Sequence, residues 1–438
     1  MVDVRLYGAK MDATTDDITA INAALVAGDA IIQNGTVLIG SSILGPSNRT
    51  LYLRNCKVRL ANASYDNIFR NADPLNGNTN VNVICLGVVV FDGNSANNYS
   101  VNYEVFGGRT NEAQTIYKAN TLFFCNTTNF KVKGVSISDR CYYAGCIQQS
   151  SYGEIEDIFF NHYNTCQNQD GIQLIYGTHH INHKRLHGRT GDDHVSIFLG
   201  TVFGTLFYPL EDFNLTGDVH HIVWDDMIIK SQYHGVIFIC GDGKKIHDIV
   251  YKNAAISYNI FLTYINSSYC SIPSTKDECY NIVIDDVVVE SSYSLNANVE
   301  LATNMKDVTI NFTNPAGRDA YRVGMKTPPY ELENVLVNGV AMIGREWTDD
   351  NKPSDLTATV LADGIHLDWQ NNESNISAIL VYASVDNVTF TALVSNLHWN
   401  TTTYKHTVAD GVLRYYKVRA LCGGFSGYSN TVEATAPV

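Results

Sequence analysis

A short pattern recurs along the middle of the chain at nearly regular intervals: an apolar residue, a few polar residues and then a β-branched residue. Most intervals are 24 to 26 residues, and Asn, Asp and Gly are frequent between the apolar runs. The pattern occurs at residues 130–132, 155–158, 181, 222–223, 246–249, 282–284 and 308–310. Strand-like alternation at such a period predicts an all-β solenoid, a parallel β-helix whose coils bury their apolar residues only by stacking on one another.

The sequence also indicates where this solenoid begins and where its coils carry insertions. Residues 16–25 form an amphipathic segment with acidic residues in its first turn, which is typical of a helix. This helix would cap the open end of the solenoid, and the first coils are expected at 51–60 and 81–91. Two intervals are longer, and their extra residues, 199–218 and 266–278, are predicted loops of the kind that builds a binding face.

The pattern changes after a polar linker at 345–352, where a series of short apolar strands begins. Trp369 and the strand at 415–420 stand where a fibronectin type III domain has its core, so this segment resembles that family. We therefore expect a parallel β-helix at 1–344, the linker and then a small β-sandwich at 353–438. The sandwich is interpreted as a spacer, with glycan or partner binding as the alternative.

The composition limits what the chain can bind. A formal charge of −14 over 438 residues opposes binding to nucleic acid and to strongly anionic polymers, so neutral or cation-bridged glycans fit better. No apolar run is long enough to span a membrane, so no membrane partner is expected. The N-terminal residues lack the basic and apolar regions of a signal peptide, so we expect either a trimmed chain or another route of export.

The cysteines do not form metal-binding motifs. Ten of them are scattered without CxxC pairs, so they are expected to be small buried hydrophobic residues. Only Cys270 and Cys279 look like a possible loop-closing disulfide, and the sequence leaves their state open. We expect no metal ion and no cofactor.

Two acidic clusters lie one predicted coil apart. They are Asn-Gln-Asp-Gly at 168–171 and Gly-Asp-Asp-His at 191–194, and each opens a short run of alternating apolar residues. Stacked strands would place the carboxylates of Asp170, Asp192 and Asp193 within one inter-strand step of about 4.8 Å. Strict alternation would turn Asp170 and Asp193 into the core, so the proposal requires both to lie in the bend before a strand.

The next coil supplies His234 and Gly235 in the same register. Asp170, Asp193 and His234 are therefore expected to superpose on successive coils and to collect on one face. Glycoside hydrolysis needs one protonated carboxyl group to donate to the leaving oxygen and an ionised one to activate water. Crowded carboxylates supply both, because like charges separate their proton affinities.

Residues 4–9 (Val-Arg-Leu-Tyr-Gly-Ala), followed by 12–21, resemble the opening of pectin-lyase-like right-handed β-helix proteins. That group includes polygalacturonases and phage tailspikes. The Asn-Gln-Asp, Gly-Asp-Asp and His-Gly segments at 168–170, 191–193 and 234–235 look like the site of the polygalacturonases, glycoside hydrolase family 28. The resemblance is specific for the fold and weak for the substrate.

The resemblance implies an inverting hydrolase. Asp192 would be the acid, Asp170 and Asp193 would hold the water, and His234 would tune the acid or contact sugar. Substrate-binding residues are expected to be Asn168, Gln173, Arg189, His194, Tyr233 and Tyr258. Polygalacturonases carry an Arg-x-Lys on the strand after the His-Gly coil, where it binds a uronate, and the matching segment here, 258–264, has no cation. Galacturonan is therefore not the expected substrate.

The same residue types also have a structural interpretation. Asn, Asp and Gly are common at β-helix turns because they bond to the local backbone, and the acidic pairs at 225–226 and 285–286 are expected to be of this kind. The histidines expected to be surface or stacking residues are His179, His180, His220 and His221.

Three functions stay open at this point. The first is an extracellular hydrolase of a polysaccharide, either secreted or part of a phage tail. The second is a lyase of the same fold, which needs a uronic acid, often Ca²⁺, and a basic residue as proton abstractor. The third is a noncatalytic receptor-binding or adhesive β-helix. For a phage tailspike the resemblance implies a homotrimer, and otherwise we expect a monomer.

Overall fold

The structure is a computed structural model, and most of the chain is described in it. The described residues are 1–98, 120–139, 142–162, 169–199, 217–257, 259–263, 270, 272, 274–290, 299–313, 323–325, 331–342, 352–372, 378–398, 400–421 and 427–438. No helix within these ranges is long and apolar enough to cross a membrane.

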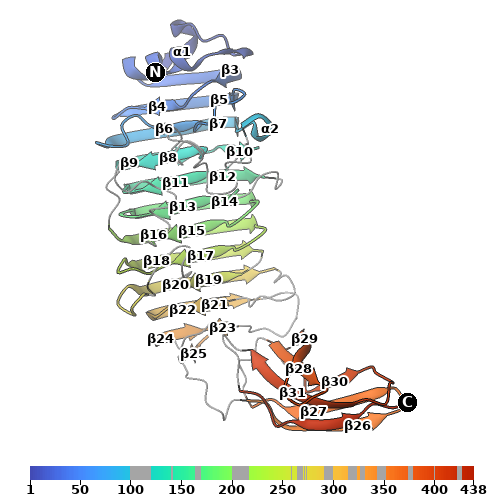
Figure 1. Ribbon diagram of the computed structural model, residues 1–438. Coiled ribbons are helices and arrows are strands. Elements are labelled where there is room, and N and C mark those ends of the chain that lie inside the picture. The colour runs from blue at the N-terminus through green and yellow to red at the C-terminus, as the bar shows by residue number, and fades with distance from the viewer. Residues whose placement is uncertain are drawn as a thin grey trace. The chain divides into compact units, whose positions relative to one another are not determined.

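The N-terminal part consists of two parallel sheets whose strands alternate along the chain (Figure 1). The long sheet contains β1 (Val2–Asp3), β3 (Ala30–Ile39), β5 (Arg49–Leu60), β7 (Asn78–Asp92), β10 (Ser136–Ser138), β12 (Ser151–Asn161), β14 (His179–Arg189), β16 (Val219–Lys230), β18 (Ile246–Ile256), β20 (Cys279–Val289), β22 (Met305–Thr313), β24 (Leu332–Val337) and β25 (Val340–Met342), with β2 (Asp12–Asp16) beside β3 and β9 (Thr127–Lys133) between β7 and β12. The short-stranded sheet contains β4 (Ile43–Gly45), β6 (Phe69–Asn71), β8 (Leu122–Cys125), β11 (Gly145–Gln148), β13 (Ile172–Ile175), β15 (Val195–Phe198), β17 (Val236–Ile239) and β19 (Ile260–Thr263). From β3 to β19 the chain passes back and forth between the two sheets, so the predicted parallel β-helix is confirmed.

The strands of the long sheet bend at corners where the backbone is left-handed. A first corner column contains Tyr152, His180, His221, Asp248 and Asn281, with φ between 53° and 56°. A second contains Asp157, Arg185, Asp226, Asn253 and Asp286, with φ between 51° and 63°. Asn and Asp tolerate this conformation better than other residues with side chains, which explains why they punctuate the repeat. The structural interpretation of Asp226 and Asp286 is thereby confirmed.

Residues between the corners stack with alternating charge. Along one column, residues paired in register run Glu156, Lys184, Asp225, Lys252 and Asp285. The Lys252 ammonium is 3.9 Å from the Asp225 carboxylate. Opposite charges on neighbouring strands stabilise the pairing by a few tenths of a kcal/mol each, roughly.

The two sheets differ in how they are covered. Strands of the long sheet, such as β16 and β20, alternate buried with exposed residues. Every residue of β11, β13, β15 and β17 is buried. Side chains on the outer side of the short-stranded sheet are therefore also shielded from solvent.

The predicted cap is present. Helix α1 (Ile18–Ala27) buries Ile18, Ile21, Ala24 and Leu25. It follows a short 3₁₀ helix, η1 (Val4–Tyr7), and a further short helix, α2 (Ser95–Asn98), lies after β7. The acidic residue before α1, Asp17, accepts hydrogen bonds from the backbone N–H groups of Lys10 and Met11. The first long coil strand is β3, earlier than the predicted 51–60.

The possible disulfide does not form in this structure. Cys270 and Cys279 are both buried, and neither is part of a disulfide. The other described cysteines are also buried and outside disulfides, as expected for small hydrophobic side chains in stacked coils.

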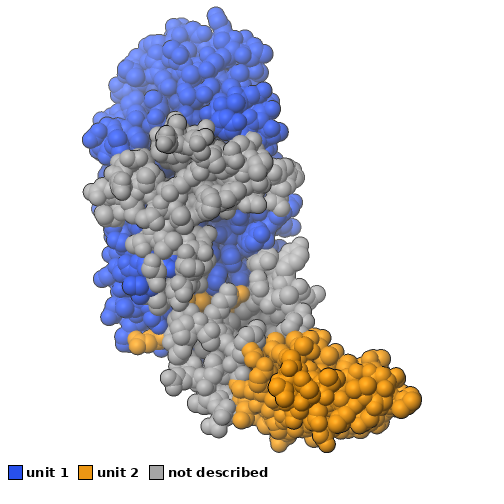
Figure 2. Space-filling model, viewed as in Figure 1, with its two compact units in different colours: residues 1–291, 303–316, 332–342 blue, residues 292–302, 317–331, 343–438 orange. Residues whose placement is uncertain are grey.

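The described chain divides into two compact units, coloured separately in Figure 2. The first comprises 1–291, 303–316 and 332–342, and the second comprises 292–302, 317–331 and 343–438. The second unit contains the parallel pair β21 (Val299–Ala302) and β23 (Val323–Met325), an antiparallel sheet of β26 (Ser354–Leu361), β27 (Gly364–Gln370) and β30 (Thr403–His406), and another of β28 (Ala378–Ser384), β29 (Thr391–Leu397), β31 (Leu413–Leu421) and β32 (Val432–Thr435).

The two antiparallel sheets form the predicted β-sandwich. Its core includes Trp369, Tyr416 and Val418, all from the positions singled out in the sequence. The domain boundaries at 344 and 353 stay predictions, and the linker lies outside the described residues except for Lys352.

Candidate active site

Three of the predicted site residues lie in equivalent bends of successive coils. Asp170, Asp193 and His234 each stand two residues before a strand of the short-stranded sheet, and the first residues of those strands pair in register. None of the three is part of a strand, so the condition set by strict alternation is met. The Gly171 N–H donates to the Asp193 carbonyl oxygen at 2.8 Å, and the His194 N–H donates to the His234 carbonyl oxygen at 3.0 Å.

Asp193 and His234 form a close pair. The Asp193 carboxylate oxygen Oδ1 is 2.7 Å from Nδ1 of the His234 ring and accepts the backbone N–H of His234 at 3.0 Å. The side chains are 11% and 20% exposed, so both are shielded but reachable from solvent. The His234 ring also stacks on Phe261, with centroids 5.0 Å apart. A carboxylate on one ring nitrogen fixes the orientation of the imidazole.

The second acidic cluster is tied to the first through the backbone. The N–H groups of Gly191 and Asp192 both donate to the Gln169 carbonyl oxygen, at 3.0 and 3.3 Å. Asp170 is buried, and Asp192 is half-buried. One Asp192 carboxylate oxygen, Oδ1, accepts the N–H of Asp193 at 3.0 Å. The three carboxylates thus belong to two bends held together by main-chain hydrogen bonds.

The glycines of the Asp-Gly and His-Gly pairs are required by close packing. A Cβ atom on Gly171 would lie 2.1 Å from the carbonyl oxygen of His194, and one on Gly235 would lie 2.6 Å from Cδ1 of Ile256. Real Cβ atoms do not approach so closely, so only glycine allows these coils to stack. The motif therefore combines a polar side chain with the space that its bend requires.

The predicted substrate-binding residues fall into three groups. Arg189 is exposed at the end of β14, three residues before Asp192, and Tyr233 is 54% exposed beside His234. Gln173 and His194 are fully buried. The remaining two, Asn168 and Tyr258, lie outside the described residues.

His194 occupies the interior of the coil. Neither ring nitrogen has a hydrogen-bond partner, and the ring meets Phe160 edge-on at 5.8 Å. Burial, together with the nearby His183 and His187, lowers the pKa of His194 to about 3, so the ring is neutral at ordinary pH. His194 therefore contacts the core and not solvent. Neither His194 nor Gln173 is a candidate for substrate binding.

Arg185 and Phe261 are not among the predicted site residues, and the structure shows the contacts of both. Arg185 stands at a corner of the long sheet and is paired with the Asp157 carboxylate. Phe261 was not predicted, although it supports His234. Its register partner on β17 is Ile237, so the stacking period would have placed it beside this coil.

Comparisons with known proteins bear on the fold. No family model matches the chain, and no curated protein matches it. A family 28 exopolygalacturonase from Yersinia enterocolitica matches at a TM-score of 0.51 and 14% identity, over 77% of this chain and 78% of that one. The Streptococcus pneumoniae surface protein and adhesin PfbA matches at 0.52 and 15%, over 76% and 89%. The chain is a right-handed parallel β-helix.

These comparisons extend no further than the fold. The two matches are a hydrolase and an adhesin, and at these identities neither activity transfers with the architecture. An Fn3-like protein from Clostridium thermocellum is 24% identical over 21% of this chain and 97% of its own, at a TM-score of 0.19, too low to assign a fold to the sandwich.

Proposed function

We propose that the protein is a glycoside hydrolase that cleaves a polysaccharide with inversion, using Asp170, Asp192, Asp193 and His234. The observation that carries the proposal is the Asp193–His234 pair, 2.7 Å apart and in register with Asp170 on the preceding coil. None of Asp170, Asp192 and Asp193 has positive φ, so a left-handed backbone does not account for these aspartates. Buried charges in proteins are paired or hydrogen-bonded, as Asp193 is with His234.

In the proposed reaction Asp192 is the acid. Its Oδ1 accepts the Asp193 amide, so the transferable proton would sit on Oδ2 and pass to the glycosidic oxygen as the bond to the anomeric carbon breaks. Asp170 and Asp193 would hold the attacking water, whose oxygen forms the new bond to that carbon and whose proton passes to a carboxylate. His234 would be a positioning residue that keeps Asp193 oriented through its Nδ1 and backbone contacts.

A noncatalytic role in adhesion is the second candidate. The match to the PfbA adhesin supports it, because that protein covers a similar share of this chain, 76% against 77%, at a similar TM-score. In either case we propose an extracellular protein with a glycan partner. A tailspike would be a homotrimer and other β-helix hydrolases monomers, which light scattering distinguishes.

The test is release of reducing ends from a panel of neutral and acidic polysaccharides, comparing the native protein with Asp192→Asn. This change removes the proposed acid while keeping shape, so release should fall by about 10²- to 10⁴-fold. Binding of each glycan is measured in parallel. A glycan that is bound but not cut would favour adhesion, and new absorbance from an unsaturated uronate would identify a lyase instead.

A further inference from the structure

Five histidines stack along the outside of the long sheet, away from the bends that hold the acidic clusters. They lie at the start of consecutive strands, as the pair His179 and His180 on β14, the pair His220 and His221 on β16, and the single His247 on β18. His179, His220 and His247 are in register, with ring centroids 4.9 Å apart at each step. The expectation that these residues stack is confirmed.

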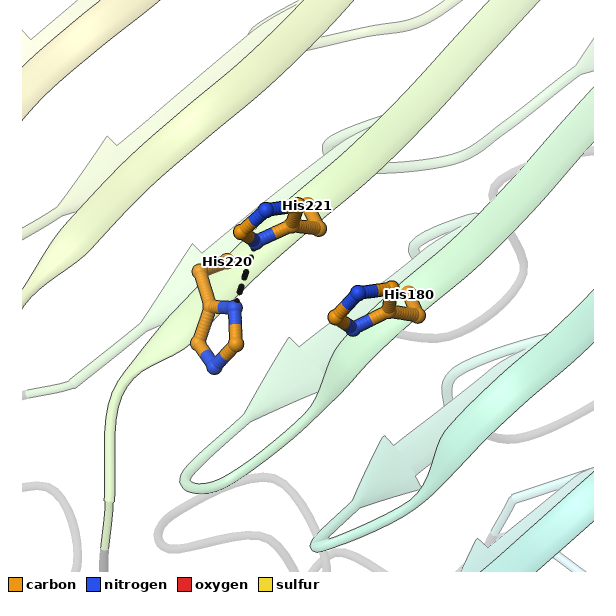
Figure 3. Close-up of side chains that lie close together, drawn as sticks. All are labelled: His180, His220 and His221. Atoms are coloured by element: carbon orange, nitrogen blue, oxygen red, sulfur yellow. Dashed lines mark hydrogen bonds between the residues drawn. The ribbon is translucent and has the colours of Figure 1, made fainter.

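His180 and His221 form a second column of stacked rings, beside the first. His180 and His221 occupy the first corner column and stack with centroids 4.4 Å apart. Within its strand, His221 Nδ1 is 2.7 Å from His220 Nδ1, the contact drawn dashed in Figure 3. One nitrogen of that pair donates and the other accepts, so at least one lone pair there is directed at the neighbouring ring.

The ligand atoms of His180, His220 and His221 all lie within 4.8 Å of one another. Bonds from nitrogen to Zn²⁺ are about 2.0 to 2.1 Å, so two ligands of one ion are at most about 4.2 Å apart. Binding of one ion would therefore require the rings to turn towards one another. His221 is exposed and the other two are half-buried, so an ion can reach them. We propose that His180, His220 and His221 bind a transition-metal cation of the Zn²⁺ or Ni²⁺ class.

The chemistry of the donors supports such a cation. Neutral imidazoles suit Zn²⁺, Cu²⁺ and Ni²⁺, whereas Ca²⁺ and Mg²⁺ prefer oxygen ligands. Three ligands leave positions for water, as at open metal sites.

The Asp248 carboxylate lies beside two of the stacked histidines, His247 and His221. Asp248, the next residue of the corner column, has Oδ2 at 2.8 Å from His247 Nδ1 and 3.6 Å from His221 Nδ1. Carboxylates beside ligating histidines orient the ring and strengthen it as a ligand. Asp248 therefore has the place of a supporting partner, without contacting the ion itself.

A bound cation would link two neighbouring coils that are separated by a long stretch of sequence. His180 is on β14 and His220 and His221 are on β16, and the chain between these strands, 190–218, is one of the two long intervals of the repeat. Because an ion that binds only the folded chain stabilises it, the site would also raise the thermal midpoint.

The chain itself supplies the test variant. Two coils beyond His220 and His221, the same two columns hold Tyr280 and Asn281, and the Tyr280 ring stacks on His247 at 4.8 Å. The triple variant His180→Asn, His220→Tyr, His221→Asn copies that coil, so it keeps an aromatic ring between His179 and His247 and suits the corner backbone while removing all three ligands. His187→Asn, on the same strand as His180, is the matched control.

The measurement is calorimetric titration of the chelator-stripped full chain with ZnCl₂ and NiCl₂, together with thermal unfolding. We expect the native protein and His187→Asn to bind one ion that the triple variant loses, with at least a 100-fold weaker dissociation constant and no metal-dependent rise in midpoint. Equal binding by the triple variant, or no binding by the native protein at millimolar metal, would overturn the proposal. If the triple variant does not fold, His220→Tyr alone is expected to weaken binding at least tenfold, and unchanged binding by it would be equally decisive.

Discussion

Aspartates occupy two kinds of bend in this β-helix, and the two kinds differ in what the backbone demands. Asp157, Asp226 and Asp286 stand at corners of the long sheet with φ between 51° and 63°, where Asn or Asp eases a left-handed backbone. Asp170 and Asp193 stand before the short-stranded sheet without positive φ, are shielded from solvent, and one of them is bonded to a histidine. Because a left-handed backbone does not require Asp170 and Asp193, they are better candidates for a catalytic role than the corner aspartates.

The same Asp→Asn substitution should affect activity very differently in the two kinds of bend, and this is the largest expected difference. Asp193→Asn keeps the shape but removes the charge that holds His234, so release of reducing ends should fall by about 10²-fold or more. The same change at the corner, Asp226→Asn, retains a residue that accepts positive φ and should leave activity within about twofold. Circular dichroism checks that both variants fold, and an equal loss in the two folded variants would remove the distinction.

A second expected difference concerns the histidine inside the bend. The folded pKa of His194 is about 3, below its ordinary value near 6.5, so below that pH the unfolded chain takes up a proton that the folded chain does not. Stability is therefore lost as pH falls from about 6.5 towards about 3, by roughly 2 to 3 kcal/mol at pH 4.5.

The check is thermal unfolding at pH 7 and pH 4.5 for the native protein and His194→Leu. The variant fills a similar volume without ring nitrogens that lack partners, so it should be no less stable at pH 7 and should lose less on acidification. His366→Leu, in the C-terminal unit, serves as a histidine control. An identical acid response in the native protein and His194→Leu would place the protonation elsewhere.

The smallest effect is expected at the corners themselves. Asp286 is exposed at φ 51°, so Asp286→Ala should lower stability by about 1 kcal/mol, while Asp286→Asn should be nearly neutral. Asp286→Gly should be no less stable than Ala, because glycine accepts positive φ without strain. Urea unfolding midpoints measure this series, and Ala equal to Asn would mean that the corner conformation imposes little selection.

Stacking and register could be predicted because the apolar period alone encodes them. The alignment of residues 172, 195 and 236 follows from that period and is observed. The first long coil strand, β3, was not predicted; it contains a corner residue, Asn34, with φ 54°.

Burial at the candidate site could not be predicted from the same period. Alternation places His194 opposite Val195, but alternation fails in a bend, and the ring enters the core instead. Gln173 is buried because the outer side of its sheet is covered, and the repeat carries no information about coverage. The contact between Asp193 and His234 could be predicted because it depends on the register of neighbouring coils and not on what covers the sheet.

The alternating charges along the long sheet also bear on how such a chain assembles. If β18 stacked directly on β14, with the intervening coil left out, Lys252 would face Lys184, and one coil further Asp285 would face Asp225. A solenoid of similar coils is prone to this error because each coil presents nearly the same apolar surface to the next. Like charges directly opposite each other destabilise a strand pair, so the column disfavours a skipped coil at every step from Glu156 to Asp285.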